Sequence, residues 1–288
     1  MKTYHFTRRL VAFATMLTTL LLLTGCMLDT GPAISPLTVK LLKVGKADAI
    51  VALTDSHVLL IDTGEEDDGE EIVEFLQKRS ISAIDAMIIT HFDQDHVGGA
   101  DTVLEEFPVK TVYIPDYESS HPEYLDFLAA AEQTSAIIER LTDPVSFRFG
   151  DAEVLIEPPA SYSIPDNTAD FDNNFSLITT IQHGDNRLVF MGDAEKQRIR
   201  QWLADSQPES CDFLKVPHHG IYNKALAELF ETLSPRYAVI CSSQKNPAEH
   251  KTLELLKQYC PSIFETKDGN VTVISNGTLL EVQQKIKH

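Results

Sequence analysis

The segment Thr90–Gly99 places two histidines and two aspartates within six positions, at His91, Asp93, Asp95 and His96. It follows the run 84–90, whose length and branched aliphatic side chains predict a buried strand. Burying so many polar groups without partners costs about 2–7 kcal/mol for each neutral group and more for each charge. A divalent cation would supply the partner, and mixed imidazole and carboxylate donors suit zinc, manganese or iron. The loop is therefore predicted to bind metal.

The spacing within this loop predicts how its side chains are arranged. If the loop stays extended, His91, Asp93 and Asp95 point to one side, and His96 joins them where the chain turns into a helix. The Gly98–Gly99 pair would let the backbone pass close to the site. The alternative is an acidic turn with incidental histidines, which leaves the four donors without partners.

The H-x-D-x-D-H pattern resembles the H-x-H-x-D-H signature of the metallo-β-lactamase fold superfamily, with Asp93 in place of the second histidine. This variant is similar to the hydrolase domain of the competence-type DNA-uptake proteins (ComEC-like) and its stand-alone relatives. The resemblance runs from about Leu37 to Val282 and implies an α/β fold, the αββα four-layer sandwich. It rests on blocks in the expected order: Val44–Ala49, Ile61–Gly64, the metal loop, Asn174–Leu177, Met191–Asp193 and Val216–Gly220.

The periodicity of the chain agrees with that architecture. Short strands come first and strands alternate with helices later, which suggests two β-rich layers with helices outside and no separate second domain. Helices are expected at Glu70–Lys78, Gly98–Phe107, Pro122–Gln133, Ala194–Asp205, Lys224–Leu233 and Pro247–Tyr259.

The resemblance implies further site residues. Asp193 matches the aspartate that bridges two metals in the superfamily, whereas taken alone a Gly-Asp pair before a helix is equally typical of an N-cap. His219 matches a histidine ligand, and His218 would then contact substrate or stabilise developing charge; the opposite assignment of these two histidines stays open. Asp62 matches an aspartate that supports the metal loop in relatives.

The third histidine of the family pattern is absent. Counting 19 positions back from Asp193 gives Asn174, which offers only a neutral oxygen or an amide donor. One metal site is therefore expected to be looser, with manganese competing well with zinc. Asn174 and Ser176 are expected to bind substrate or to support the site. His250 resembles a late histidine of the ComEC-like branch and is predicted to contact substrate or act in catalysis, the alternative being a surface residue.

Metal-assisted hydrolysis is the reaction class that these residues imply. Two divalent ions, Zn²⁺ or alternatively Mn²⁺, would activate a bridging water for attack on a carbonyl or phosphorus. Asp95 is expected to bind metal and orient that water, and His218 or His250 to stabilise charge or protonate the leaving group. A phosphodiester or phosphate ester, small or polymeric, is favoured because chemistries known in this branch include nucleases and a surface phosphorylcholine esterase. The alternatives are a lactam, thioester or lactone hydrolase, and a non-catalytic binding lipoprotein on the same fold.

The N-terminal region predicts a signal that targets the protein out of the cytoplasm. Residues 1–26 have a positive start and an apolar stretch, 10–23, too short to span a membrane comfortably. The stretch ends at Leu23-Thr24-Gly25-Cys26, which resembles the lipobox of bacterial lipoproteins and predicts lipidation, including palmitate, at Cys26. Residues 27–36 would be a tether and 37–288 the hydrolase domain. This predicts an extracytoplasmic protein anchored to the membrane, with an uncleaved anchor or a plain secretory signal as the alternatives.

Charge and cysteine content bound the partners. The formal net charge of −19 opposes non-specific attraction to a polyanion, so no stable nucleic-acid complex is expected. Cys211 and Cys241 flank apolar runs and are predicted to be small core residues. With Cys26 lipidated, the odd number of remaining cysteines leaves a free thiol or an intermolecular pair.

Overall fold

The structure, a computed structural model, describes residues 34–163 and 172–285. The chain divides into two units, Met1–Ile34 and Ser35–His288, and the fold is that of the second unit. The predicted signal peptide, the lipidation site at Cys26 and most of the tether lie outside the described residues. Within the described ranges, no helix is long and apolar enough to cross a membrane.

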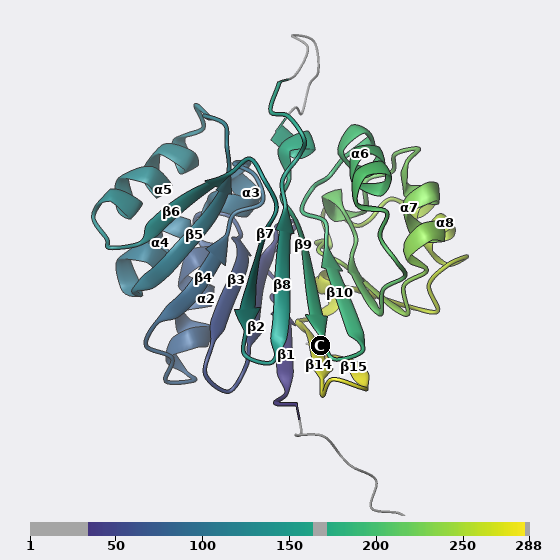
Figure 1. Cartoon of the computed structure of the whole chain (residues 1–288), viewed down its shortest axis with the longest axis horizontal. Coiled ribbons are helices and arrows are strands. Elements are labelled where there is room, and N and C mark those ends of the chain that lie inside the picture. Colours follow the sequence, from purple (N-terminus) through teal and green to yellow (C-terminus); the bar gives the residue numbers. More distant parts are fainter. Residues whose placement is uncertain (1–33, 164–171, 286–288) are drawn as a thin grey trace, which may run out of the picture. The chain divides into compact units, whose positions relative to one another are not determined.

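An eight-stranded mixed sheet forms one half of the domain (Figure 1). Its order is β15-β14-β1-β2-β3-β4-β5-β6. The pairs from β15 to β3 are antiparallel and those from β3 to β6 are parallel, so β3, β4 and β5 end at the same edge. The strands are β1 (Leu37–Leu41), β2 (Ala49–Leu53), β3 (Val58–Thr63), β4 (Ile84–Ile88), β5 (Val109–Pro115), β6 (Ile137–Leu141), β14 (Val271–Ser275) and β15 (Leu280–Gln284).

A seven-stranded sheet forms the other half, in the order β13-β12-β11-β10-β9-β8-β7. The strands from β7 to β10 are antiparallel, whereas β10 to β13 are parallel. The strands are β7 (Val145–Phe149), β8 (Ala152–Glu157), β9 (Ile178–His183), β10 (Asn186–Phe190), β11 (Phe213–Lys215), β12 (Tyr237–Ile240) and β13 (Ser262–Glu265).

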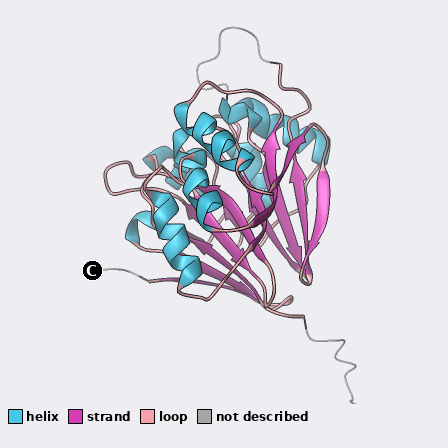
Figure 2. Ribbon diagram, turned by 90° about the vertical axis from the view of Figure 1, so that its left-hand side faces the viewer, coloured by secondary structure: helices cyan, strands magenta, loops and turns pink. Residues whose placement is uncertain are grey.

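Helices cover the outer face of each sheet, which gives the four αββα layers (Figure 2). Alternation along β3 shows how the layers form: Leu59 and Ile61 enter the core between the sheets, whereas Leu60 packs under the helices. The helices on the first sheet are α2 (Asp68–Gln77), α3 (Gln94–Val97), α4 (Ala100–Glu106) and α5 (Pro122–Glu132); those on the second are α6 (Lys196–Ser206), α7 (Leu226–Leu233) and α8 (His250–Leu256). The predicted sandwich is confirmed.

Two strands were not expected from the sequence, and both lie at sheet edges. β6 ends the first sheet and β13 ends the second, and their side chains are only partly buried. An edge strand needs less apolar surface, so its sequence carries a weaker hydrophobic signal. The last helix also begins later than predicted, at His250 rather than Pro247.

Candidate metal centre

The loop after β4 carries the predicted donors at the edge where the parallel strands end. Phe92 is fully buried and packs on Tyr117 and Tyr124 at ring distances of 4.6 and 4.3 Å, which anchors the loop between two of the donors. The chain turns into α3 at Gln94, earlier than expected. Asp95 is therefore helical rather than extended, yet its carboxylate still faces the other donors.

The glycine pair after the donors has a different role from the one predicted. A Cβ at Gly99 would lie 2.6 Å from the oxygen of Thr63 and the nitrogen of Gly69, and one at Gly98 would meet the backbone of Glu65 and Glu66. The close approach is thus to the segment leading into α2 and not to the metal centre.

Asp62 orients the metal loop from the end of β3. Its carboxylate accepts hydrogen bonds from the Thr90 amide at 2.7 Å and the Thr90 hydroxyl at 2.8 Å, and it lies 2.8 Å from Nδ1 of His96. Because Nδ1 of His96 is held by a carboxylate, the ring presents Nε2 to the site. Asp62 itself is left-handed, with φ of 57°, which indicates that the surrounding contacts impose its conformation.

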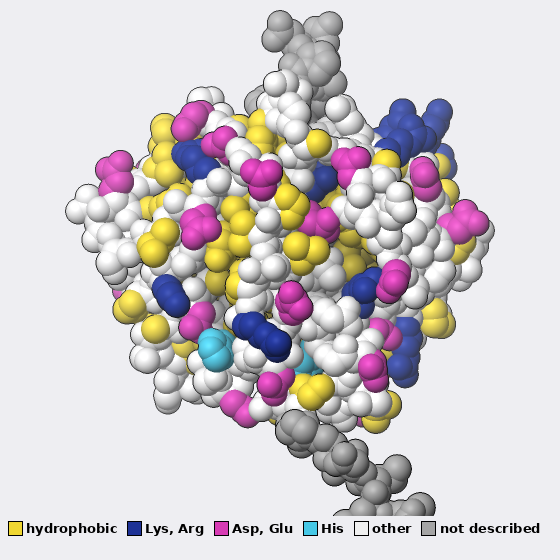
Figure 3. Space-filling model, viewed as in Figure 1, with side chains coloured by type: hydrophobic (Ala, Val, Ile, Leu, Met, Phe, Trp, Pro, Cys, Tyr) yellow, Lys and Arg dark blue, Asp and Glu magenta, His cyan; other side chains and the backbone are white. Residues whose placement is uncertain are grey.

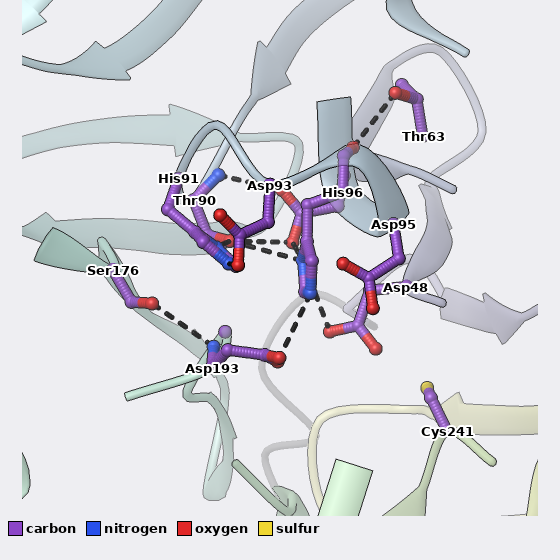
Figure 4. A network of polar contacts seen from close by, with 12 residues as sticks. Asp48, Thr63, Thr90, His91, Asp93, Asp95, His96, Ser176, Asp193 and Cys241 are labelled. Atoms are coloured by element: carbon purple, nitrogen blue, oxygen red, sulfur yellow. Dashed lines mark hydrogen bonds and ion pairs between the residues drawn. The ribbon is translucent and has the colours of Figure 1, made fainter. Parts of the chain in front are cut away.

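Asp193 contacts two histidines, and Figure 4 shows it beside His96 and Ser176. One oxygen lies 3.2 Å from Nε2 of His96 and the other 3.0 Å from Nε2 of His219. The Asp193 amide donates to the Ser176 hydroxyl at 3.1 Å, so Ser176 supports the turn that carries this carboxylate. The N-cap of α6 is Glu195, which leaves Asp193 free of that role.

The two adjacent histidines after β11 point in different directions. His219 is buried. Its Nδ1 donates to the Cys241 carbonyl at 3.1 Å, and its Nε2 lies 3.2 Å from Asp95. Nδ1 of His218 lies 3.2 Å from Glu195, and its Nε2 is 3.9 Å from Asp193. The geometry places His219 inside the cluster and His218 at its rim.

The carboxylates and histidines of this cluster stabilise each other's charged forms. Burial opposes protonation of His219, but the carboxylates of Asp193 and Asp95 outweigh it and raise its pKa to about 9. Burial likewise opposes ionisation of Asp95, yet contact with His219 and the charge of His96 hold its pKa well below the usual range. The pKa of Asp193 is also lowered, against burial, by His219, His96 and Lys215.

The donor set fits divalent metal. Nε2 of His91, His96 and His219 is buried and lacks a hydrogen-bond partner of acceptable geometry among the described residues, although carboxylates lie close by. Donor atoms from Asp95, His96, Asp193 and His219 all lie within 4.8 Å of one another. Ring nitrogens and carboxylates that face each other in this way are the ligands that zinc and manganese take in proteins.

A buried lysine is the main feature that the sequence analysis missed. Lys215, in β11, is fully buried; its ammonium pairs with Asp48, lies 3.4 Å from Asp193, and donates to the Gly192 carbonyl at 2.9 Å. Burial opposes its charge, but Asp48 and Asp193 outweigh burial and raise its pKa. The sequence signal that could have revealed this buried lysine is its position between Leu214 and Val216 in a short apolar run.

The structure does not bring Asn174 to the donors. Its side-chain oxygen accepts from the Arg198 amide at 3.1 Å, in the first turn of α6. Two positions earlier, Asp172 is buried and faces Asp93. Burial and the charge of Asp93 raise the pKa of Asp172.

His250 lies outside the cluster. Its side chain is 88% exposed, and its ion-pair partner among the described residues is Glu254, at 3.8 Å. The preceding residue, Glu249, donates its amide to the carbonyl of Gly220 at 3.2 Å, so the start of α8 contacts the turn that carries His218 and His219. A role for His250 in substrate contact stays a prediction.

The remaining cysteines are all buried and free: Cys211, Cys241 and Cys260. The two that were predicted to be core residues belong to apolar clusters, Cys241 between the sheets and Cys211 under the helices of the second sheet.

Two curated relatives share much of this chain. It is 30% identical over 209 residues to ComE operon protein 3 of Bacillus subtilis (strain 168), which covers 71% of this chain and 26% of that protein. It is 26% identical over 252 residues to Recombination protein 2 of Haemophilus influenzae, which covers 84% of this chain and 29% of that protein. The chain thus spans less than a third of the length of either relative.

Solved structures show the same fold at low identity. YhfI from Bacillus subtilis, a metallo-beta-lactamase fold protein, matches with a TM-score of 0.53 and 10% identity over 86% of this chain and 100% of that one. Tm1679, described as a metal-dependent hydrolase of the beta-lactamase superfamily, matches with a TM-score of 0.53 and 13% identity over the same shares. The family model described as the metallo-beta-lactamase superfamily matches residues 42–244, well over half of the sequence. The chain belongs to the metallo-β-lactamase superfamily.

Proposed function

We propose that this chain is a binuclear metal-dependent hydrolase of the ComEC-like branch that cleaves a phosphodiester or phosphate ester. One observation carries the proposal: three buried Nε2 atoms, from His91, His96 and His219, meet carboxylates without making hydrogen bonds of acceptable geometry. Such donors support a bound cation, because unpaired buried polar groups cost free energy, and the superfamily supports hydrolysis as its chemistry.

The residues of the chain divide the work. Divalent ions held here would supply Lewis-acid polarisation and an activated water. One ion would be held by Asp95, His96, Asp193 and His219, and a second would be met by His91 and Asp93. Asp62, through Nδ1 of His96, and the Cys241 carbonyl, at Nδ1 of His219, fix the orientation of two rings.

Groups at the rim are placed to act on substrate. Nε2 of His218 is 3.9 Å from the bridging Asp193, while Nδ1 lies 3.2 Å from Glu195. These distances support a role for His218 in stabilising developing negative charge or protonating a leaving group. Lys46 is partly exposed, with Nζ 3.9 Å from Asp95, and offers a cation to a phosphate oxygen.

The relatives support a phosphoester substrate over a lactam. The two curated relatives are named ComE operon protein 3 and Recombination protein 2, and the rim lysine suits an anionic substrate. Acidic side chains spread over the whole face drawn in Figure 3, with Lys and Arg in separate groups between them. Together with the net charge of −19 this favours transient contact with substrate over a stable nucleic-acid complex.

Location is part of the same proposal. The charged start, the short apolar stretch and Leu23-Thr24-Gly25-Cys26 support an extracytoplasmic protein that is anchored through lipid at Cys26.

Metal analysis followed by a substrate panel tests the proposal. The full chain, purified in detergent, is assayed for bound Zn²⁺ and Mn²⁺ and then offered chromogenic phosphodiester, phosphomonoester, thioester and lactam substrates. We expect metal-dependent phosphoester hydrolysis that chelation abolishes. Lys46→Ala should lower kcat/KM for phosphoesters without changing metal content. A protein that binds no metal, or that prefers a lactam, would contradict the proposal.

A further inference from the structure

One side of the metal centre lacks a third ligand if only the expected residues are considered. Nε2 of His91 is fully buried, has no hydrogen-bond partner among the described residues, and lies 3.5 Å from Asp93. The residue at the position of the family's third histidine, Asn174, accepts a hydrogen bond from the amide of Arg198 instead. An imidazole and one carboxylate alone make a weak site for a divalent ion.

Asp172 is placed to complete this side. It begins the 3₁₀ helix Asp172–Phe175 and is 4% exposed. Neither of its carboxylate oxygens has a hydrogen-bond partner of acceptable geometry in the described ranges, 34–163 and 172–285. Donor atoms of Asp93, His121 and Asp172 all lie within 4.8 Å of one another, and His121 is exposed at the start of α5.

The two carboxylates of Asp93 and Asp172 favour a cation between them. Asp172 is buried and faces Asp93, whose side chain is 33% exposed, so the two carboxylates repel. The Tyr117 hydroxyl acts on Asp172 as a donor but offsets only part of the cost of burial. The lysine of the centre, Lys215, is paired with Asp48 and Asp193 and is not among the groups that face Asp172. A divalent cation between Asp93 and Asp172 would offset their repulsion, and Nε2 of His91 would reach it from the side of Asp93, which lies 3.5 Å away.

We propose that Asp172 is a metal ligand, which holds the first of two divalent ions together with His91 and Asp93, with His121 as an exposed outer donor. This rests on the proposed metal-dependent function but not on the identity of the substrate. Two carboxylates and one imidazole make an oxygen-rich site, so this position should favour Mn²⁺ over Zn²⁺ more than the position built by His96 and His219. The competing explanation is a proton shared between the two aspartates.

Metal titration of the metal-free full chain separates these explanations. Mn²⁺ binding is followed by electron paramagnetic resonance and calorimetry in the wild type, in Asp172→Asn and in the matched control Asp116→Asn, which removes an exposed carboxylate close to β5. We expect two Mn²⁺ equivalents in the wild type and the control. Asp172→Asn should lose one equivalent or bind it at least about 10-fold more weakly, since even residues that only support ligands cost that much.

Two further readouts show whether a structural defect causes the loss. Metal-free Asp172→Asn should unfold at the same or a higher temperature than the wild type, because the substitution removes repulsion from Asp93. Asp172→His should restore the second equivalent and shift its preference towards Zn²⁺. Full affinity and stoichiometry in Asp172→Asn would overturn the inference in favour of a shared proton, whereas a wild type that binds no metal would overturn the proposed function itself.

Discussion

Replacing Lys215 by methionine tests whether the buried ion pair stabilises the metal centre. Methionine retains the apolar stem and removes the ammonium that pairs with Asp48. Asp48 is 1% exposed, and its Oδ1 has no hydrogen-bond partner among the described residues. The nearest histidine nitrogens, Nδ1 of His96 and His219, are 3.9 and 3.8 Å away and already contact Asp62 and the Cys241 carbonyl. The carboxylate would be left buried with the imidazolium of His219 as its nearby cation, which is already paired with Asp95 and Asp193.

The expected cost follows from that burial. Removing one partner of a buried pair costs about 3–5 kcal/mol, a large part of the roughly 5–15 kcal/mol that stabilises a typical domain. The double variant Lys215→Met/Asp48→Asn leaves no buried charge and should recover most of the loss, with a coupling free energy of at least about 2 kcal/mol. The control Lys78→Met breaks an exposed i,i+4 pair with Glu74 and should cost at most about 0.5 kcal/mol.

Urea unfolding of the full chain in detergent, with excess chelator at pH 7, measures these free energies. The chelator matters because bound cations would compensate Asp48 and hide the effect. A loss for Lys215→Met no larger than that of the surface control, or strictly additive effects in the double variant, would refute the reasoning that this pair carries the charge balance of the centre.

Three further predictions concern catalysis, protons and location. Asp95→Asn keeps the shape of the side chain but removes a charge 3.2 Å from His219, so phosphoester hydrolysis should fall at least about 10²-fold with the fold retained by circular dichroism; full activity would assign hydrolysis to another site. The pKa of His219 in the metal-free protein is about 9, and its proton must leave before metal binds, so the affinity from chelator competition should rise as pH increases from 6.5 to 9; an unchanged affinity would contradict this. In the metal-free protein that raised pKa also contributes stability below pH 6.5, which is lost as pH rises through 9. Cys26→Ala should shift the protein from membranes to precursor or soluble fractions, and unchanged membrane attachment would indicate an uncleaved helix.

The metal loop could be predicted from the sequence because its polar donors directly follow a strand that must be buried. Four donors directly after an apolar strand need an external partner, whatever the rest of the fold does. The strands behind the loop also followed from their apolar runs, since both faces of central strands are buried. Asp193 and Asp62 came from the resemblance rather than from local pattern, because only tertiary contacts bring β3, β4 and β10 to one place.

Counting along the chain identifies a position but does not say which way its side chain faces. The count of 19 positions before Asp193 led to Asn174, but the 3₁₀ turn directs that side chain to the backbone of α6 and leaves Asp172 facing Asp93. Residue spacing alone cannot distinguish Asn174 from Asp172 as the inward-facing residue, because the loop before Asp193 has no regular periodicity. Lys215 was overlooked for a related reason: a lysine in a short strand suggests an exposed face, unless the partner Asp48 is already known to lie opposite.

The histidine turn shows why the roles of two adjacent residues could not be separated from the sequence. His218 and His219 both have positive φ, 48° and 50°, a conformation that costs side-chain-bearing residues roughly 1–3 kcal/mol each. Contacts on both sides impose it: the ring of His219 meets the Cys241 carbonyl, and Gly220 packs so closely on Ala248 that a Cβ would lie 2.9 Å away. With the backbone held in this way, the ring of His219 points towards Asp193 and the ring of His218 points towards Glu195. These contacts come from Cys241, directly after β12, and Ala248, before α8, so the directions of the two rings are defined only by the tertiary structure.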